Sequence, residues 1–181
     1  LKRFFPDVTI FRMDNDTTST KGAHRSILSQ FRETKPAILV GTQMIAKGHD
    51  FEDVILVGIV DADQSLYQSD YRSIERTFQL ITQVSGRAGR SKDQGKVILQ
   101  TYSPRHYVYH YAQNYDFKGF FKKEANLRKV TNFPPYTKVL RILFSHEDEN
   151  IVANEIKVCY NNVQKVKEKF KDDFIYLDVM K

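Results

Sequence analysis

The stretch of sequence best suited to chemistry is QVSGRAGR at residues 83–90, which places two glycines and two arginines within five residues. Arg87 and Arg90 are three positions apart, so on a helical turn both side chains point to one side. Two forked guanidinium groups facing one way match a phosphate better than a single carboxylate. Gly86 and Gly89 carry no side chain and allow another molecule to approach the backbone. The pattern predicts a phosphate site, and the alternative is a solvated basic turn that binds nothing.

Two other polar segments directly follow apolar runs. GTQMIAKGHDF (41–51) comes after AILV (37–40), and DADQS (61–65) comes after VILVGIV (54–60). Ligands of an open parallel α/β sheet bind at the carboxyl ends of its strands. We therefore expect these two segments and residues 83–90 to form a composite site along one edge of a sheet. The alternative is that strand ends are simply polar and that turns use glycine.

The elements that must position these segments follow an α/β pattern. Apolar runs typical of strands alternate with helical patterns at 20–31 and 69–84, and the strands are expected at 8–13, 37–40, 54–60 and 96–100. Buried strands that alternate with helices indicate a parallel sheet covered by helices. We assign residues 1–110 to this α/β domain.

The pattern changes after residue 110. Residues 111–136 predict a basic helical linker that ends in FPPY, because consecutive prolines cannot continue a helix. Residues 137–181 predict the start of a small α+β domain with β-α-β order: a strand at 137–144, an amphipathic helix near 152–170 and a strand at 174–179. Both ends of the chain interrupt a pattern, so we expect it to be a piece of a longer protein.

A cationic window connects these two parts. Its seven cations face one acid, Glu124, and they are Lys118, Lys122, Lys123, Arg128, Lys129, Lys138 and Arg141. Aromatic residues are interleaved with them: Phe117, Phe120, Phe121, Phe133 and Tyr136. Aromatic faces among cations suit single-stranded DNA, and the first five cations are the candidate contacts. The alternative is a solvated helix face whose aromatic residues pack inward together with Leu127.

Composition sets broad limits on the protein. Hydrophobic residues make up 41% of the 181 residues, enough for a sizeable core, and the formal net charge of +6 favours a polyanionic partner. The single cysteine, Cys159, permits no internal disulfide and no zinc site built from cysteines alone, which suits a reducing cytoplasm. The histidines lack metal-ligand spacing, so no metal site is predicted. No apolar run reaches membrane-spanning length, and no signal peptide is recognised.

The motifs also resemble a known family. QVSGRAGR resembles motif VI (Q-x-x-G-R-x-G-R) of superfamily 2 helicases, and ILVGTQMIAKGHDF resembles their motif V. FPDVTIFRMDNDTT, DADQSL, DYRSIERTFQL and FPPYT extend the likeness over essentially the whole chain, and together they are similar to the PriA family of replication-restart helicases. The resemblance implies a RecA-like parallel-sheet helicase lobe followed by a truncated small α+β domain. It also implies a 3′–5′ ATP-dependent DNA helicase that acts at stalled forks in primosome assembly.

Site residues follow from the same resemblance. Arg87 and Arg90 match the arginines that meet the phosphates of the nucleotide, with Arg90 as the arginine finger. Gln83 matches a position that couples the nucleotide to the other lobe. Gly48 and Asp50 match positions near the ribose and the cleft between the lobes.

The remaining expectations concern DNA and cofactors. Thr42 matches a contact to the DNA backbone, while Asp61 and Asp63 are interpreted as polar strand-end residues. The chain has no G-x-x-x-x-G-K-[ST] loop and no D-E-x-H box, so ATP with Mg would be held mainly by a lobe outside it, and the zinc module of the family would also lie outside.

Expected partners are DNA forks and single strands, other primosome proteins and single-stranded DNA-binding protein, in the bacterial cytoplasm at the nucleoid. Two alternatives remain open. The first is the second lobe of another superfamily 2 translocase, active in fork reversal or repair. The second is a non-catalytic DNA-binding module.

Overall fold

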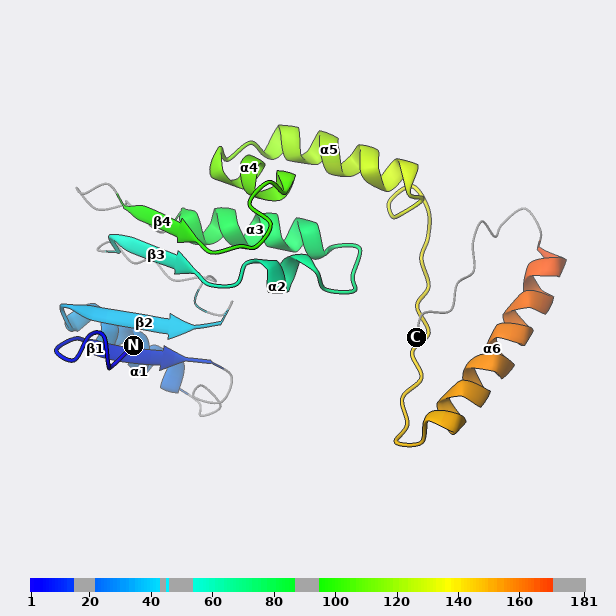
Figure 1. Cartoon of the computed structure of the whole chain (residues 1–181), viewed down its shortest axis with the longest axis horizontal. Helices are drawn as coiled ribbons and strands as arrows, with labels where there is room; N and C mark the ends of the chain where they lie inside the picture. Colours follow the sequence, from blue (N-terminus) through cyan, green and yellow to red (C-terminus); the bar gives the residue numbers. More distant parts are fainter. Residues whose placement is uncertain (15–21, 43–44, 46–53, 87–94, 171–181) are drawn as a thin grey trace. The chain divides into compact units, whose positions relative to one another are not determined.

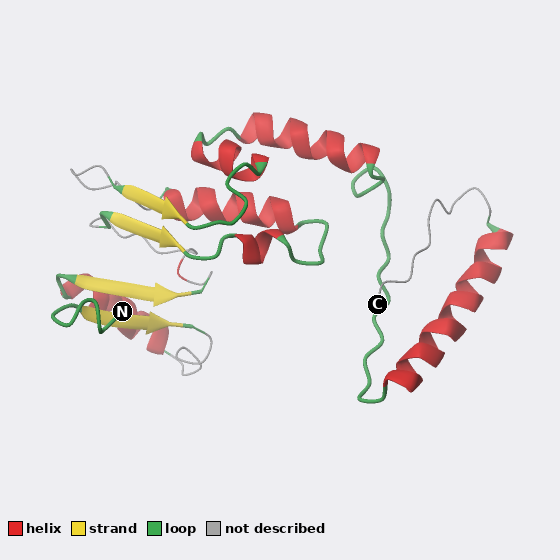
Figure 2. Cartoon of the chain, viewed as in Figure 1, coloured by secondary structure: helices red, strands yellow, loops and turns green. Residues whose placement is uncertain are grey.

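The structure is a computed structural model that describes residues 1–14, 22–42, 45, 54–86 and 95–170. The chain divides into two compact units, Leu1–Tyr136 and Thr137–Lys181. Each unit is described by itself below. Figure 1 shows the elements in sequence order, and Figure 2 shows where helices and strands alternate.

The first unit begins with a parallel β-α-β arrangement. β1 (Thr9–Met13) pairs in parallel with β2 (Ala37–Gly41), and α1 (Ala23–Glu33) connects them. Met13 and Leu28 are buried between the strands and the helix, with Phe31 and Leu39 packed against them. This small apolar core holds the first strand pair against its crossover helix.

A second β-α-β arrangement follows. β3 (Leu56–Ile59) pairs in parallel with β4 (Lys96–Leu99). The connection contains the short α2 (Asp63–Leu66) and then α3 (Ser73–Ser85). Parallel strands need such a crossover, because a tight turn cannot return the chain to the same end of the sheet. Both strand pairs are parallel and have helical connections, so the predicted α/β class is confirmed. The described strands form two separate two-stranded sheets rather than the single predicted sheet, and no residue of β2, β3 or β4 is buried.

Two further helices pack on α3. α4 (Tyr107–Gln113) and α5 (Phe117–Val130) follow β4, and Figure 1 shows them stacked above α3. The rings of Phe78 in α3 and Phe120 in α5 stack with centroids 4.1 Å apart and an interplanar angle of 4°. Their core also contains Ile81, Val108 and Ala112. The segment predicted as a basic linker therefore forms a layer of the first unit.

The second unit differs from its predicted order. α6 (Glu149–Lys169) forms where the amphipathic helix was expected, but none of its residues is buried. Residues 137–144 form no strand, although apolar side chains alternate there, and Leu140 and Leu143 are exposed. A strand needs hydrogen bonds from a neighbouring strand, and none of the described residues supplies one. The strand predicted at 174–179 lies outside the described residues.

Helix length and composition in the described ranges also bear on membranes. None of the helices there combines the length and the apolar character needed to cross a bilayer.

Candidate functional site

Strand direction separates the predicted segments onto two edges. Figure 1 shows the four strand arrows of the first unit pointing the same way. Thr42 and Asp61 follow β2 and β3 and therefore lie at the carboxyl edge. Gln83 and Gly86 lie at the end of α3, which leads to the amino end of β4. The described ends of these segments therefore lie at opposite ends of their strands, because a crossover helix carries the chain back to the start of the next parallel strand. The composite site itself stays a prediction, since most of residues 41–51 and 83–90 lie outside the described residues.

The described part of the arginine segment is the end of α3. Gln83 is exposed on the last turn of the helix, and Gly86 caps that turn by donating its backbone N–H to the carbonyl of Thr82 at 3.0 Å. The carboxyl end of a helix carries partial negative charge, which favours cations nearby. Arg87 and Arg90 come next in sequence but lie outside the described residues, as do Gly48 and Asp50.

Thr42 lies exposed directly after β2. Its carbonyl accepts a hydrogen bond from the backbone N–H of Ile45 at 3.1 Å, so the chain turns immediately after the strand. Gly41, the residue before it, has no room for a side chain, because an added Cβ would collide with the carbonyl oxygen of Met13. The glycine of the motif thus serves the close approach of β1 and β2, and the turn presents Thr42 to solvent.

Asp63 has a role that the sequence did not predict. Its side chain is buried and accepts hydrogen bonds from the backbone N–H of Tyr102 at 2.6 Å, the Thr101 hydroxyl at 2.8 Å and the Tyr109 hydroxyl at 3.0 Å. Burial raises the pKa of a carboxyl group, but these donors and nearby His106 outweigh burial, so the pKa of Asp63 is lowered. The carboxylate ties α2 to the end of β4 and to α4.

Asp61, two residues earlier, is exposed and has a left-handed backbone with φ of 51°. It is an acidic group at the carboxyl edge. Among the described residues, no group of three or more His, Cys, Asp or Glu side chains is arranged to hold a metal ion.

The basic surface on α5 contains both cations and aromatic rings. Four of the predicted contacts are exposed there: Lys118, Lys122, Lys123 and Lys129. Phe117 and Phe121 are also exposed, at 62% and 60%, and their rings stack on each other with centroids 6.4 Å apart. Phe120 is only 3% exposed and belongs to the core. The predicted aromatic set is therefore divided between the core and the surface.

Arg128 lies apart from that surface. Its side chain is 13% exposed, with Nε 3.0 Å from Glu124 Oε1 and Nη2 3.0 Å from Glu75 Oε2. Burial lowers the pKa of the guanidinium, but the two carboxylates more than offset this and raise it. Because both carboxylates already neutralise this cation, Arg128 does not belong to the exposed surface that could attract DNA. The one hint of this role in the sequence was the i, i+4 spacing of Glu124 and Arg128.

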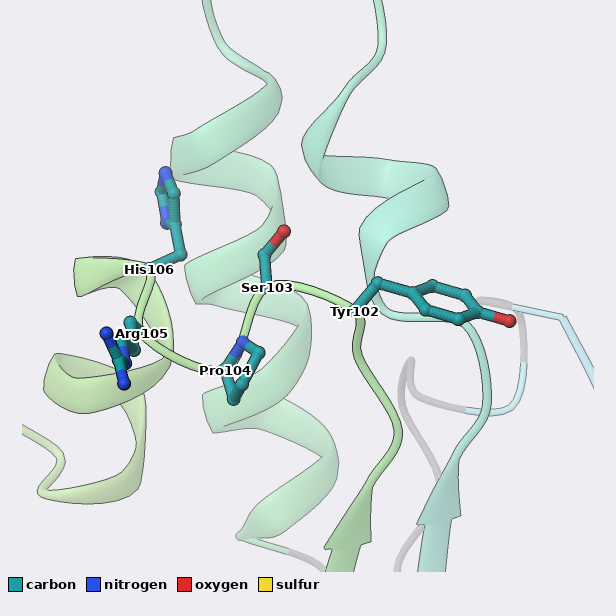
Figure 3. A pocket seen from close by; sticks show the side chains of 5 residues that line it. All are labelled: Tyr102, Ser103, Pro104, Arg105 and His106. Atoms are coloured by element: carbon teal, nitrogen blue, oxygen red, sulfur yellow. The ribbon is translucent and has the colours of Figure 1, made fainter.

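The sequence patterns did not single out the loop between β4 and α4, which lies at the carboxyl ends of the strands. Residues 102–106 lie in the connection between β4 and α4 and line an open pocket of about 400 Å³. Figure 3 shows the side chains around it, with the Tyr102 ring extending to one side of the loop and Arg105 and His106 lying on the other. The signal available in the sequence was an aromatic residue followed by proline and arginine directly after an apolar strand.

Comparison with known proteins places these features in a class. A model of the helicase conserved C-terminal domain matches residues 2–92. This range includes the strands β1, β2 and β3, and it also includes the segment after β2 and the start of the segment after α3. The first unit thus carries the C-terminal domain of a helicase.

Relatives define the family more closely. Replication restart protein PriA from Bacillus subtilis is 49% identical over 148 residues, which cover 82% of this chain and 18% of that protein. The protein of the same name from Synechocystis is 49% identical over 151 residues, with the same coverage of 82% and 18%. That from Chlamydia pneumoniae is 36% identical over 196 residues, covering 100% of this chain and 26% of the relative. The chain belongs to the PriA family of replication restart proteins, and it spans about a fifth to a quarter of the length of these relatives.

Proposed function

We propose that the chain is the second RecA-like lobe, with the adjoining segment, of an ATP-dependent DNA helicase that acts in replication restart. The observation that carries the proposal is the helicase-domain match over the segments that resemble motifs V and VI. In this proposal the helicase moves 3′ to 5′ at stalled forks and works with other primosome proteins and single-stranded DNA-binding protein. It acts in the bacterial cytoplasm, at the nucleoid.

The ATP side of the proposal involves the end of α3 and the segments that resemble motifs V and VI. Gln83, at the end of α3, acts together with Arg87 and Arg90, the arginines that follow it in sequence, on an ATP molecule that another lobe holds with Mg. The arginines neutralise charge that develops on the phosphates during transfer. Gly48 and Asp50 approach the ribose side of the same cleft.

The carboxyl edge is the DNA side of the proposal. Thr42 is exposed there on a turn fixed by the Ile45 N–H, which supports a contact between its hydroxyl and a DNA phosphate. The exposed lysines of α5 supply a second, sequence-independent attraction for the DNA backbone. ATP hydrolysis would move the lobe relative to its partner lobe and shift these DNA contacts.

The decisive test is an arginine substitution in the full-length protein. Arg90→Ala should leave nucleotide binding largely intact and lower DNA-stimulated ATP turnover by roughly a hundredfold or more. Arg76→Ala is a matched control, since Arg76 lies on α3 and pairs with Asp70 at 2.9 Å, away from the end of the helix. Near-wild-type turnover of Arg90→Ala and Arg87→Ala would remove both arginines from the ATP site.

A second test uses the chain alone. It contains no phosphate-binding loop and no D-E-x-H box, so the purified 181-residue chain should show no ATPase activity when DNA is added. Turnover clearly above a buffer blank would contradict an ATP site divided between two lobes.

A further inference from the structure

The loop between β4 and α4 exposes an aromatic ring at the carboxyl edge. Tyr102 is 85% exposed, although a tyrosine ring is largely apolar. Tyr67, at the end of α2, is exposed as well, and its hydroxyl lies 2.8 Å from the Ser103 hydroxyl. Two exposed tyrosines therefore lie in hydrogen-bonded segments after β3 and β4, and Figure 1 shows the carboxyl ends of these strands on the same side of the first unit as the end of β2, which Thr42 follows.

The backbone beneath the Tyr102 ring is held in place. The N–H of Tyr102 donates to Asp63 at 2.6 Å, and the N–H of Ser103 donates to the Thr101 hydroxyl at 2.9 Å. Thr101 in turn donates to Asp63, so one buried carboxylate fixes the start of the loop. A ring on a backbone that is already ordered loses less conformational entropy when a ligand stacks on it.

The charges around the loop indicate which ligand it fits. Arg105 is exposed, and no carboxylate of the described residues pairs with it. The exposed acid Asp61 follows β3 and Asp14 follows β1, so a phosphate is favoured beside Arg105 and disfavoured beside the ends of those two strands. Figure 3 shows Tyr102 and Arg105 on different sides of the loop, separated by Ser103 and Pro104.

We propose that the loop formed by residues 102–106 binds single-stranded DNA, with the Tyr102 ring stacked on a base and Arg105 bound to a neighbouring phosphate. A strand that crosses Ser103 and Pro104 meets both groups, and every base has a face that can stack, so the interaction is independent of base sequence. The proposal rests on the proposed DNA helicase function and extends its DNA side from Thr42 to the end of β4.

The test measures binding of the full-length protein to fluorescein-labelled oligothymidylate by anisotropy. Tyr102→Ala should weaken binding about fivefold or more, while Tyr102→Phe, which keeps the ring, should bind like the wild type. Arg105→Ala should weaken binding and lower the slope of log K against log salt by about 0.7, the value for one phosphate contact on a single strand. Phe4→Ala is the control, because Phe4 is 77% exposed but precedes β1 and so lies at the amino edge.

Folding does not confound these variants. Asp63 holds Tyr102 through its backbone N–H, which alanine retains, so the thermal unfolding midpoint of Tyr102→Ala should equal that of the wild type. As an independent readout, oligonucleotides that carry 5-iododeoxyuridine should cross-link to Tyr102 on irradiation.

The outcomes separate the two proposals. If the wild-type protein binds DNA and Tyr102→Ala binds equally well without cross-linking at Tyr102, the loop site is wrong and the helicase function stands. If the wild-type protein binds no DNA at all, both the proposed helicase function and the loop site are wrong. Loss of binding to a protein partner with unchanged DNA affinity would assign the loop to protein recognition and overturn the DNA site.

Discussion

The guanidinium of Arg128 joins α5 to the start of α3, with Nη2 3.0 Å from Glu75 Oε2 across 53 positions of sequence. The same group lies over the Tyr71 ring, 5.4 Å from its centroid, and its Nη1 donates to the carbonyl of Pro134 at 3.4 Å. The Arg128 side chain thus connects α3, the helix that leads to the arginine segment, with Pro134 near the end of the first unit.

Removing this cation should destabilise the first unit. Arg128→Met leaves the Glu124 carboxylate buried without its cation, and we expect the free energy of unfolding to fall by about 3 kcal/mol, the lower end of the range for a broken buried pair, since Glu75 is partly exposed. Urea unfolding followed by circular dichroism measures the change. Arg76→Met is the control, because its pair with Asp70 is far less buried than the Arg128 pairs and should contribute less than about 1 kcal/mol.

A second substitution tests the cause. Adding Glu124→Gln to Arg128→Met removes the uncompensated charge, so the double variant should recover part of the stability that the single variant lacks. Equal stability of Arg128→Met and Arg76→Met would show that the Arg128 pairs contribute little.

Two adjacent phenylalanines on α5 should differ sharply. Phe120 is 3% exposed and stacks on Phe78, so Phe120→Ala should lower the free energy of unfolding by about 3–5 kcal/mol. Phe121 is 60% exposed, so Phe121→Ala should change it by less than about 1 kcal/mol. Urea unfolding of both variants makes the comparison, and similar losses would contradict the orientation of α5.

Acid should weaken the first unit through His106. Burial lowers the pKa of this imidazole below its usual 6.5, and Asp63 and Glu124 offset that only in part. Its Nδ1 also accepts the N–H of Val108 at 3.3 Å, which a proton on that atom would prevent. The unfolded chain therefore binds the proton at a higher pH than the folded one. The stability that His106 contributes is complete above about pH 6.5 and is lost as the pH falls toward the lowered value.

Thermal unfolding between about pH 8 and pH 5 measures this effect, in the range where histidine titrates. His106→Asn keeps a side chain that can cap α4 but does not titrate, so its midpoint should fall less with acid than that of the wild type. Identical acid dependence of the two proteins would exclude His106 as a source of it.

The exposed lysines of α5 should set part of the salt dependence of DNA binding. Replacing Lys118, Lys122 and Lys129 with alanine in the full-length protein should weaken binding for every base sequence. The slope of log K against log salt should fall by up to about 0.7 for each DNA phosphate that the protein no longer neutralises. Lys123 is left in place, because its ammonium lies 5.9 Å from the centroid of the Tyr107 ring and helps hold α4 to α5.

A control triple removes the same charge elsewhere. Lys157, Lys165 and Lys169 are exposed on α6, and their replacement by alanine should leave the slope closer to that of the wild type. If both triples change the slope equally, net charge and not the α5 surface governs binding.

Local sequence patterns were enough to predict the parallel strands and the family. AILV and VILVGIV are uninterrupted apolar runs, and both formed parallel strands close to the expected positions. The burial expected for such runs was wrong, since none of their residues is buried in the structure. Signals of this kind depend only on neighbours in sequence. The motif spacing likewise identified the helicase family, while Arg87, Arg90, Gly48 and Asp50 stay predictions because they lie outside the described residues.

Features that depend on distant partners emerged only from the folded chain. Arg128 looked like one more cation of a basic helix until the fold brought Glu75 to it, and Tyr102 became a candidate DNA contact because Asp63, 39 positions away, holds its backbone at an exposed edge. Residues 137–144 show that a local pattern alone is not enough for a strand. Their pattern predicted one, but no strand formed because no neighbouring strand pairs with them in the described part of the chain. The direction of a crossover helix separated Gln83 from Thr42 onto opposite edges, and that direction follows from strand pairing in three dimensions.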